Sequence, residues 1–154
     1  MLRITNASRD GFILTDFPRN VPEAEMLEEY RGGMNAFVHL NLPEEIQVAV
    51  EEAKYKCTDC GRQYYQEAVV SDEHEVYIEP FMPEDGHCYD CGSRSIKRGG
   101  DVDEFERELA AYRTRKEELL AFYDHLGLLV DFDLKQGYGD YGKLRDQIQF
   151  NIKH

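Results

Sequence analysis

The chain has 154 residues and a formal net charge of −13, with 42% hydrophobic and 32% charged residues. This composition indicates a globular domain of common size, and the acidic excess argues against a nucleic-acid or anionic-membrane binder, because both need a basic face. No apolar run approaches the roughly 18–20 residues of a membrane helix, and no secretory signal is visible. We therefore expect an intracellular protein without membrane insertion; a mitochondrial or other large-complex setting stays open.

Strands and helices are predicted to alternate in the first third of the chain. Residues 12–17 are predicted as a buried strand, and residues 21–30 as a helix with a proline in its first turn. Residues 35–42 are predicted as a second strand, and residues 43–54 as a second helix. This alternation is typical of a parallel α/β sheet.

The pattern changes after residue 54. Residues 55–97 combine cysteines, β-forming residues and turn residues, which predicts a separate small β-rich module. Residues 101–126 are predicted as a helix with one buried face and a break near Thr114, and residues 128–134 as a third strand. A turn-rich loop and a final helix over residues 143–154 complete the prediction.

The four cysteines form two Cys-x-x-Cys-Gly units, "CTDCG" and "CYDCG". Two residues between cysteines allow a tight turn to direct both sulfurs at one ion, and four thiolates make a closed tetrahedral site that suits structural zinc. The predicted ligands are Cys57, Cys60, Cys88 and Cys91. Reduced or disulfide-linked cysteines are the alternative; His87 is expected to be an exposed neighbour of the site.

An acidic insert, residues 71–86, makes the gap between the two units 27 residues long. We predict a solvated hairpin extension. A docking arm is the alternative, because residues 76–78, 81 and 82 are apolar.

Four stretches in chain order resemble the adenylate kinase family over about residues 10–154. "GFILTDFPRNVPEAEML" resembles the motif at that family's AMP site, and "LNLPEEI" is similar to the strand and helix that lead into its mobile lid. "CTDCGRQYY" with "GHCYDCGSRSIKR" resembles the zinc-bearing lid, and "YRTRKEELLAFYDHLGLLVDFD" resembles the family's last long helix and strand.

The resemblance implies a partial adenylate-kinase-like parallel sheet flanked by helices, with an inserted zinc-ribbon-like β lid. It divides the chain into a partial core with the AMP-site region (1–54), the lid (55–97) and C-terminal core helices with the last strand (98–154). The implied reaction is phosphoryl transfer from Mg-ATP to AMP, which depends on positive groups around the moving phosphoryl.

The AMP motif is only partly kept. The resemblance assigns the arginine that contacts the AMP phosphate to Arg19, a nucleotide-binding candidate. It places Thr15 where the family has an aspartate near magnesium, Asp16 where it has glycine, and Glu23 where it has the glutamine that reads adenine. Arg19 paired with Asp16 or Glu23 is the structural alternative.

Phosphate-binding positions after this motif are also changed. Two arginines of the helix entering the lid correspond to Glu51 and Tyr55. After the lid, Arg98 and Asp101 match an arginine and an aspartate and are the only catalytic candidates. A further arginine corresponds to Glu108, or to Arg107 if the alignment slips by one.

These changes predict a degenerate adenylate-kinase-like protein without catalytic residues, a zinc-held structural or assembly subunit with other protein subunits as partners. The alternative is a kinase component whose phosphate loop comes from another chain or from a missing N-terminal part, because no G-x-x-x-x-G-K-[ST] motif occurs in this sequence. Only this alternative requires ATP, AMP and Mg²⁺.

The resemblance also implies a sheet that lacks one strand, between residues 12–17 and 35–42. Such a gap leaves two unpaired edges. Three outcomes are open: the two strands pair directly, residues 1–5 fill the gap, or a partner supplies the strand.

Overall fold

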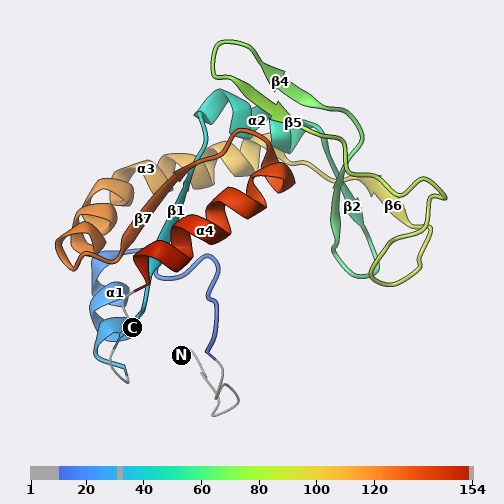
Figure 1. The fold of residues 1–154 in the computed structure, drawn as a ribbon. Coiled ribbons are helices and arrows are strands. Elements are labelled where there is room, and N and C mark those ends of the chain that lie inside the picture. Colours follow the sequence, from blue (N-terminus) through green and yellow to red (C-terminus); the bar gives the residue numbers. More distant parts are fainter. Residues whose placement is uncertain (1–10, 31–32, 153–154) are drawn as a thin grey trace.

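The structure is a computed structural model that describes residues 11–30 and 33–152 (Figure 1). The core elements are helix α1 (Val21–Glu28), strand β1 (Phe37–Asn41), helix α2 (Glu44–Glu52), helix α3 (Val102–His125), strand β7 (Leu129–Asp133), the 3₁₀ turn η1 (Gly137–Asp140) and helix α4 (Tyr141–Asn151). Between α2 and α3 lie β2 (Lys54–Cys57), β3 (Gln63–Tyr65), β4 (Val69–Ser71), β5 (Val76–Ile78) and β6 (Ile96–Arg98).

The centre of the core is a parallel pair of strands. β1 and β7 run in register from Phe37 opposite Leu129 to Asn41 opposite Asp133. Helices α3 and α4 both contact β7, and they lie on opposite sides of the pair in Figure 1. The parallel pair between helices confirms the predicted α/β class.

An aromatic stack joins helix α3 to this sheet. Tyr123 is fully buried and stacks on Phe37 of β1, with ring centroids 4.1 Å apart and planes 5° apart. Ala24 of α1 and Leu119 of α3 complete the buried cluster. Helix α1 is oriented at its start by Asn20, whose side chain accepts a hydrogen bond from the Glu23 N–H.

The residues between α2 and α3 form two small antiparallel sheets. One has three strands in the order β3-β2-β6, and the other is the β4–β5 hairpin. Figure 1 shows the three-stranded sheet at one end of the molecule, with the hairpin reaching back over α2. The predicted β-rich content of this region is confirmed.

Three details of the prediction are wrong. Residues 12–17 form no strand, and Ile13 is 92% exposed. A strand needs a neighbouring backbone, and no described strand lies between this segment and β1. Helix α3 runs without a break through Thr114, whose hydroxyl donates to the Ala111 carbonyl, and α4 begins two residues earlier than predicted, at Tyr141. Residues 1–5 lie outside the described part of the chain.

No helix within residues 11–30 and 33–152 is both long and apolar enough to cross a bilayer. The 24-residue helix α3 has the length, but charged side chains are spread along it.

A solvent-exposed ion pair links α2 to α3 and predicts a pH effect. The Arg113 guanidinium binds the Glu44 carboxylate through two hydrogen bonds, which lower the pKa of Glu44 below its usual value. Because the pKa is lowered in the folded state, the contribution of this pair is present above the ordinary glutamate pKa and is lost as pH falls through the lowered value. We expect NMR titration of the Glu44 carboxyl carbon to show its pKa rising in Arg113→Ala; an unchanged titration would contradict the pairing.

Candidate functional site

The two Cys-x-x-Cys-Gly units form matching turns at the end of the three-stranded sheet. The Gly61 N–H donates to the Cys57 carbonyl at 2.9 Å, and the Gly92 N–H donates to the Cys88 carbonyl at 2.8 Å. Both glycines have positive φ, 83° and 72°, a conformation that glycine adopts without steric cost. The glycine after each cysteine pair is therefore what allows the turn to close.

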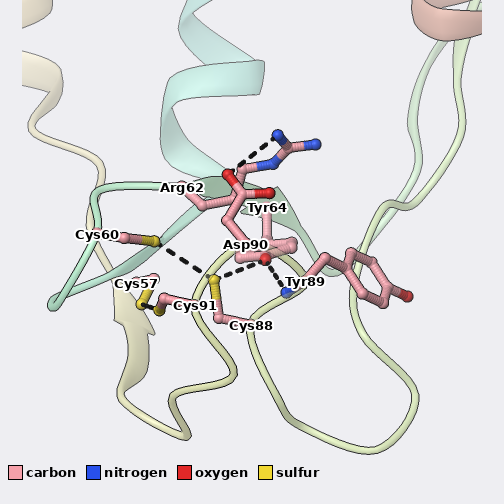
Figure 2. A network of polar contacts seen from close by, with 8 residues as sticks. All are labelled: Cys57, Cys60, Arg62, Tyr64, Cys88, Tyr89, Asp90 and Cys91. Atoms are coloured by element: carbon pink, nitrogen blue, oxygen red, sulfur yellow. Dashed lines mark hydrogen bonds and ion pairs between the residues drawn. The ribbon is translucent and has the colours of Figure 1, made fainter.

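The turns bring the four cysteine sulfurs together (Figure 2). All four lie within 4.8 Å of one another; Cys57 and Cys91 are 3.7 Å apart, and Cys60 and Cys88 are 3.4 Å apart. A tetrahedral zinc site with Zn–S bonds of about 2.3 Å requires sulfurs about 3.8 Å apart. The spacing and the all-thiolate donor set fit a structural metal ion and leave no place for a catalytic water.

Tyr64 supports this cluster from its buried side. Its side chain is fully buried, its hydroxyl donates to the Cys88 sulfur at 3.1 Å, and the same oxygen accepts from the Tyr89 N–H at 2.9 Å. The hydrogen bond from Tyr64 lowers the pKa of the Cys88 thiol to about 6, which favours the thiolate that binds metal. Spacing rules for metal ligands give no signal for such a supporting hydroxyl; from the sequence, Tyr64 in "QYY" is expected only to pack.

His87 is not part of the cluster, as expected, although it is half-buried rather than exposed. Its Nε2 accepts a hydrogen bond from Arg94 at 2.8 Å. Its neighbour Cys88 is the ligand candidate.

Glu51 occupies the junction between the core and the three-stranded sheet. The residue is 8% exposed, and its carboxylate pairs with the Lys54 ammonium and accepts a hydrogen bond from the Asp101 N–H at 3.1 Å. Asp101 in turn caps α3 by accepting from the Glu104 N–H at 3.0 Å, and Arg98 donates to the Glu52 carbonyl at 3.1 Å. The catalytic candidates Arg98 and Asp101 are thus both engaged in holding this junction.

A cleft of about 1030 Å³ lies beside strand β1. Its lining includes residues 37–40 of β1, parts of α3 and α4 and the segment 11–19, but no residue of β7. The backbone groups of Phe37 and Asn41 bond toward β7; because alternate residues of a strand direct their backbone groups to opposite sides, those of Val38 and Leu40 face the other way. The cleft therefore follows the edge of β1 that no described strand covers.

Comparison with known proteins gives one consistent result. An adenylate kinase of Archaeoglobus fulgidus is 33% identical over 128 residues, which are 80% of this chain and 54% of that protein. An adenylate kinase of Methanosarcina barkeri is 27% identical over 148 residues, covering 93% of this chain and 62% of that protein. A probable chloroplastic adenylate kinase of Arabidopsis thaliana is 30% identical over 132 residues, 82% of this chain and 43% of that protein.

The chain is a distant homologue of the adenylate kinases. It spans about half the length of curated relatives that it matches. No family model matches the sequence.

The segment that resembles the adenylate kinase AMP motif has local partners around Arg19. The Arg19 guanidinium pairs with the Asp16 carboxylate, and the backbone N–H of Arg19 donates to the Glu23 carboxylate at 2.7 Å. Asp16 has φ of 60°, in the region that favours glycine, which is the residue that the family pattern has there. Thr15, like Asp16 and Arg19, lines the cleft.

The cleft also borders one of the two residues that the resemblance offers for a later arginine of the family. Glu108 lines it, whereas the side chain of Arg107 turns back to the Asp103 carbonyl of its own helix at 3.0 Å. Tyr55 packs beside the cysteine cluster. Glu108 is thus a carboxylate at the cleft, whereas Arg107 and Tyr55 have partners of their own nearby.

Proposed function

We propose that this adenylate-kinase homologue is a non-catalytic structural subunit of a larger assembly, with a structural zinc ion held by Cys57, Cys60, Cys88 and Cys91. The observation that carries the proposal is the cleft along the edge of β1 that no strand within residues 11–30 and 33–152 covers. An unpaired edge with exposed apolar side chains beside it is a site where another polypeptide adds a strand. Leu40 of β1 is 47% exposed and Phe12 across the cleft is 41% exposed.

The charges around the altered motif support the non-catalytic part of the proposal. Phosphoryl transfer needs positive groups that neutralise the transferred phosphoryl. Glu108 faces the cleft, Glu51 binds the Lys54 ammonium at the junction, and Arg19 is paired with Asp16. A carboxylate at a phosphate contact replaces attraction by repulsion of similar size.

We expect no saturable binding when Mg-ATP or AMP is titrated into the chain and followed by calorimetry. A full-length adenylate kinase such as that of Archaeoglobus fulgidus is the positive control. A coupled assay for ADP formation by the chain alone should give no signal above the buffer. Saturable binding with ordinary turnover would contradict the proposal and favour a working kinase component.

The partner site is tested separately by photo-crosslinking in the native host. A benzoylphenylalanine at Leu40 should crosslink a segment of a different polypeptide, and one at Val70, which is exposed away from the cleft, should not crosslink that segment. Crosslinks from position 40 only to the chain's own residues 1–10 or to a second copy would contradict an assembly role for the cleft.

A further inference from the structure

The β4–β5 hairpin has one apolar face turned to the core and one turned to solvent. Val69 pairs with Ile78, and Val76 lies opposite Ser71 on the same face; Val69 and Val76 are 8% and 2% exposed. The other face carries the cross-strand pair Val70 and Tyr77, which are 57% and 48% exposed. Of the two faces, the inward one is therefore the one that packs against the rest of the protein.

The inward face packs on helix α2 and not on the cysteine cluster. Val69 and Val76 share a buried cluster with Ile46 of α2, and Ala49 packs against it. The cysteine cluster has a separate core around Cys57, Tyr64 and Cys88. Beside the first cluster, His74 at the hairpin tip binds the Glu45 carboxylate of α2. The hairpin therefore belongs to the core by its packing, although it lies between the two cysteine pairs in sequence.

A second attachment joins the hairpin to the loop after β7. The Tyr77 N–H donates to the Lys135 carbonyl at 2.7 Å, and the Lys135 ammonium donates to the His74 carbonyl at 2.7 Å. The buried Asp140 carboxylate fixes this loop by accepting from the N–H groups of Lys135 and Gln136 at 2.7 and 2.6 Å. The loop after β7 thus holds the hairpin on this side as well.

The chain just after the hairpin is bonded to the three-stranded sheet. Phe81 and Tyr65 of β3 exchange two backbone hydrogen bonds of 2.8 and 2.9 Å. The Phe81 ring lies 5.5 Å from the ring of Tyr64 and 5.3 Å from that of Tyr138 in η1. Phe81 therefore contacts both the three-stranded sheet, through Tyr65 and Tyr64, and the core, through Tyr138.

We propose that the β4–β5 hairpin is a strap that fixes the cysteine module (residues 54–65 and 81–98) to the core in one orientation. Within the described residues, the module otherwise joins the core through its connections to α2 and α3 and through the contact of Phe81 with Tyr138 of η1. Rotation about these two connections would expose the buried Val76 and break the Tyr77–Lys135 hydrogen bond. The strap does not depend on whether the chain binds nucleotide or has a partner in the cleft.

The test is hydrogen exchange of the full chain together with a pulsed electron-resonance distance measurement. Spin labels are attached through an unnatural amino acid at the exposed positions Asp59, in the module, and Glu106, in α3. In the unaltered sequence the hairpin amides should exchange as slowly as those of α2, and the label distance should have one narrow distribution. In V76S/I78S, exchange of the hairpin amides should accelerate on the order of a hundredfold, and the distance distribution should broaden.

The matched control is V70S/Y77S, which makes the same kind of change on the solvent face of the same strands. It should leave both measurements unchanged. Lys135→Met removes a single attachment and should give an intermediate acceleration even if V76S/I78S fails to fold. Fast exchange of the hairpin in the unaltered sequence, or equal distance distributions in V76S/I78S and the control, would overturn the proposal.

Discussion

Removal of the metal is expected to unfold the cysteine module while the parallel strand pair stays folded. The module has a small core of its own, since β3 and β6 have three residues each. Its buried cluster of Cys57, Tyr64 and Cys88 is covered by four partly buried side chains, Tyr55, Phe81, Met82 and Ile96. Structural zinc contributes about 10–16 kcal/mol in small zinc-finger peptides near neutral pH. A chelator, or the variant Cys88→Ser, should therefore abolish exchange protection of the amides in β2, β3 and β6.

The measurement combines zinc content by mass spectrometry with hydrogen exchange. We expect one zinc ion per chain in the unaltered protein. In Cys88→Ser the zinc content should fall by more than half. The control is His87→Ala, next in sequence but outside the sulfur cluster, which should keep its zinc. Full protection of the module after zinc is removed, or loss of zinc in His87→Ala, would show that the four-thiolate assignment is wrong.

The elements that were predicted well are those whose formation depends mainly on neighbouring residues in the sequence. The apolar run at β7 and the proline-opened helix α2 formed within two residues of their expected bounds. The Cys-x-x-Cys-Gly spacing predicted the sulfur cluster because a short turn fixes both sulfurs whatever the rest of the chain does. Adenylate kinase homology then follows from the order of these pieces.

Other features depend on residues far away in sequence, and local pattern cannot report them. Residues 12–17 have strand-like composition, but a strand forms only where another backbone accepts its hydrogen bonds. The insert at residues 71–86 was expected to be solvated because it is acidic. Its β5 strand instead buries Val76 against α2, a partner that precedes the first cysteine pair.

Tyr123→Ala is expected to destabilise the core by about 3–5 kcal/mol, the range found when a large aromatic side chain is removed from a well-packed interior. The Tyr123 ring is fully buried, stacks on Phe37 of β1 and contacts the ring of Phe122. It therefore joins α3 to the one strand that also borders the cleft. Urea unfolding followed by circular dichroism, fitted for the free energy of unfolding, measures the loss.

Tyr123→Phe separates the ring from the hydroxyl. Burial, reinforced by the nearby Glu28 carboxylate, raises the pKa of Tyr123 above its usual value, so the hydroxyl stays protonated at neutral pH and contributes at most one ordinary polar contact. The phenylalanine variant keeps the stack on Phe37 and should lose no more than about 1 kcal/mol. If both variants were equally destabilised, the hydroxyl and not the ring stack would hold α3 to the sheet. If neither were, the parallel strand pair would be stabilised by contacts outside this cluster, and the cleft beside β1 would tolerate a displaced α3.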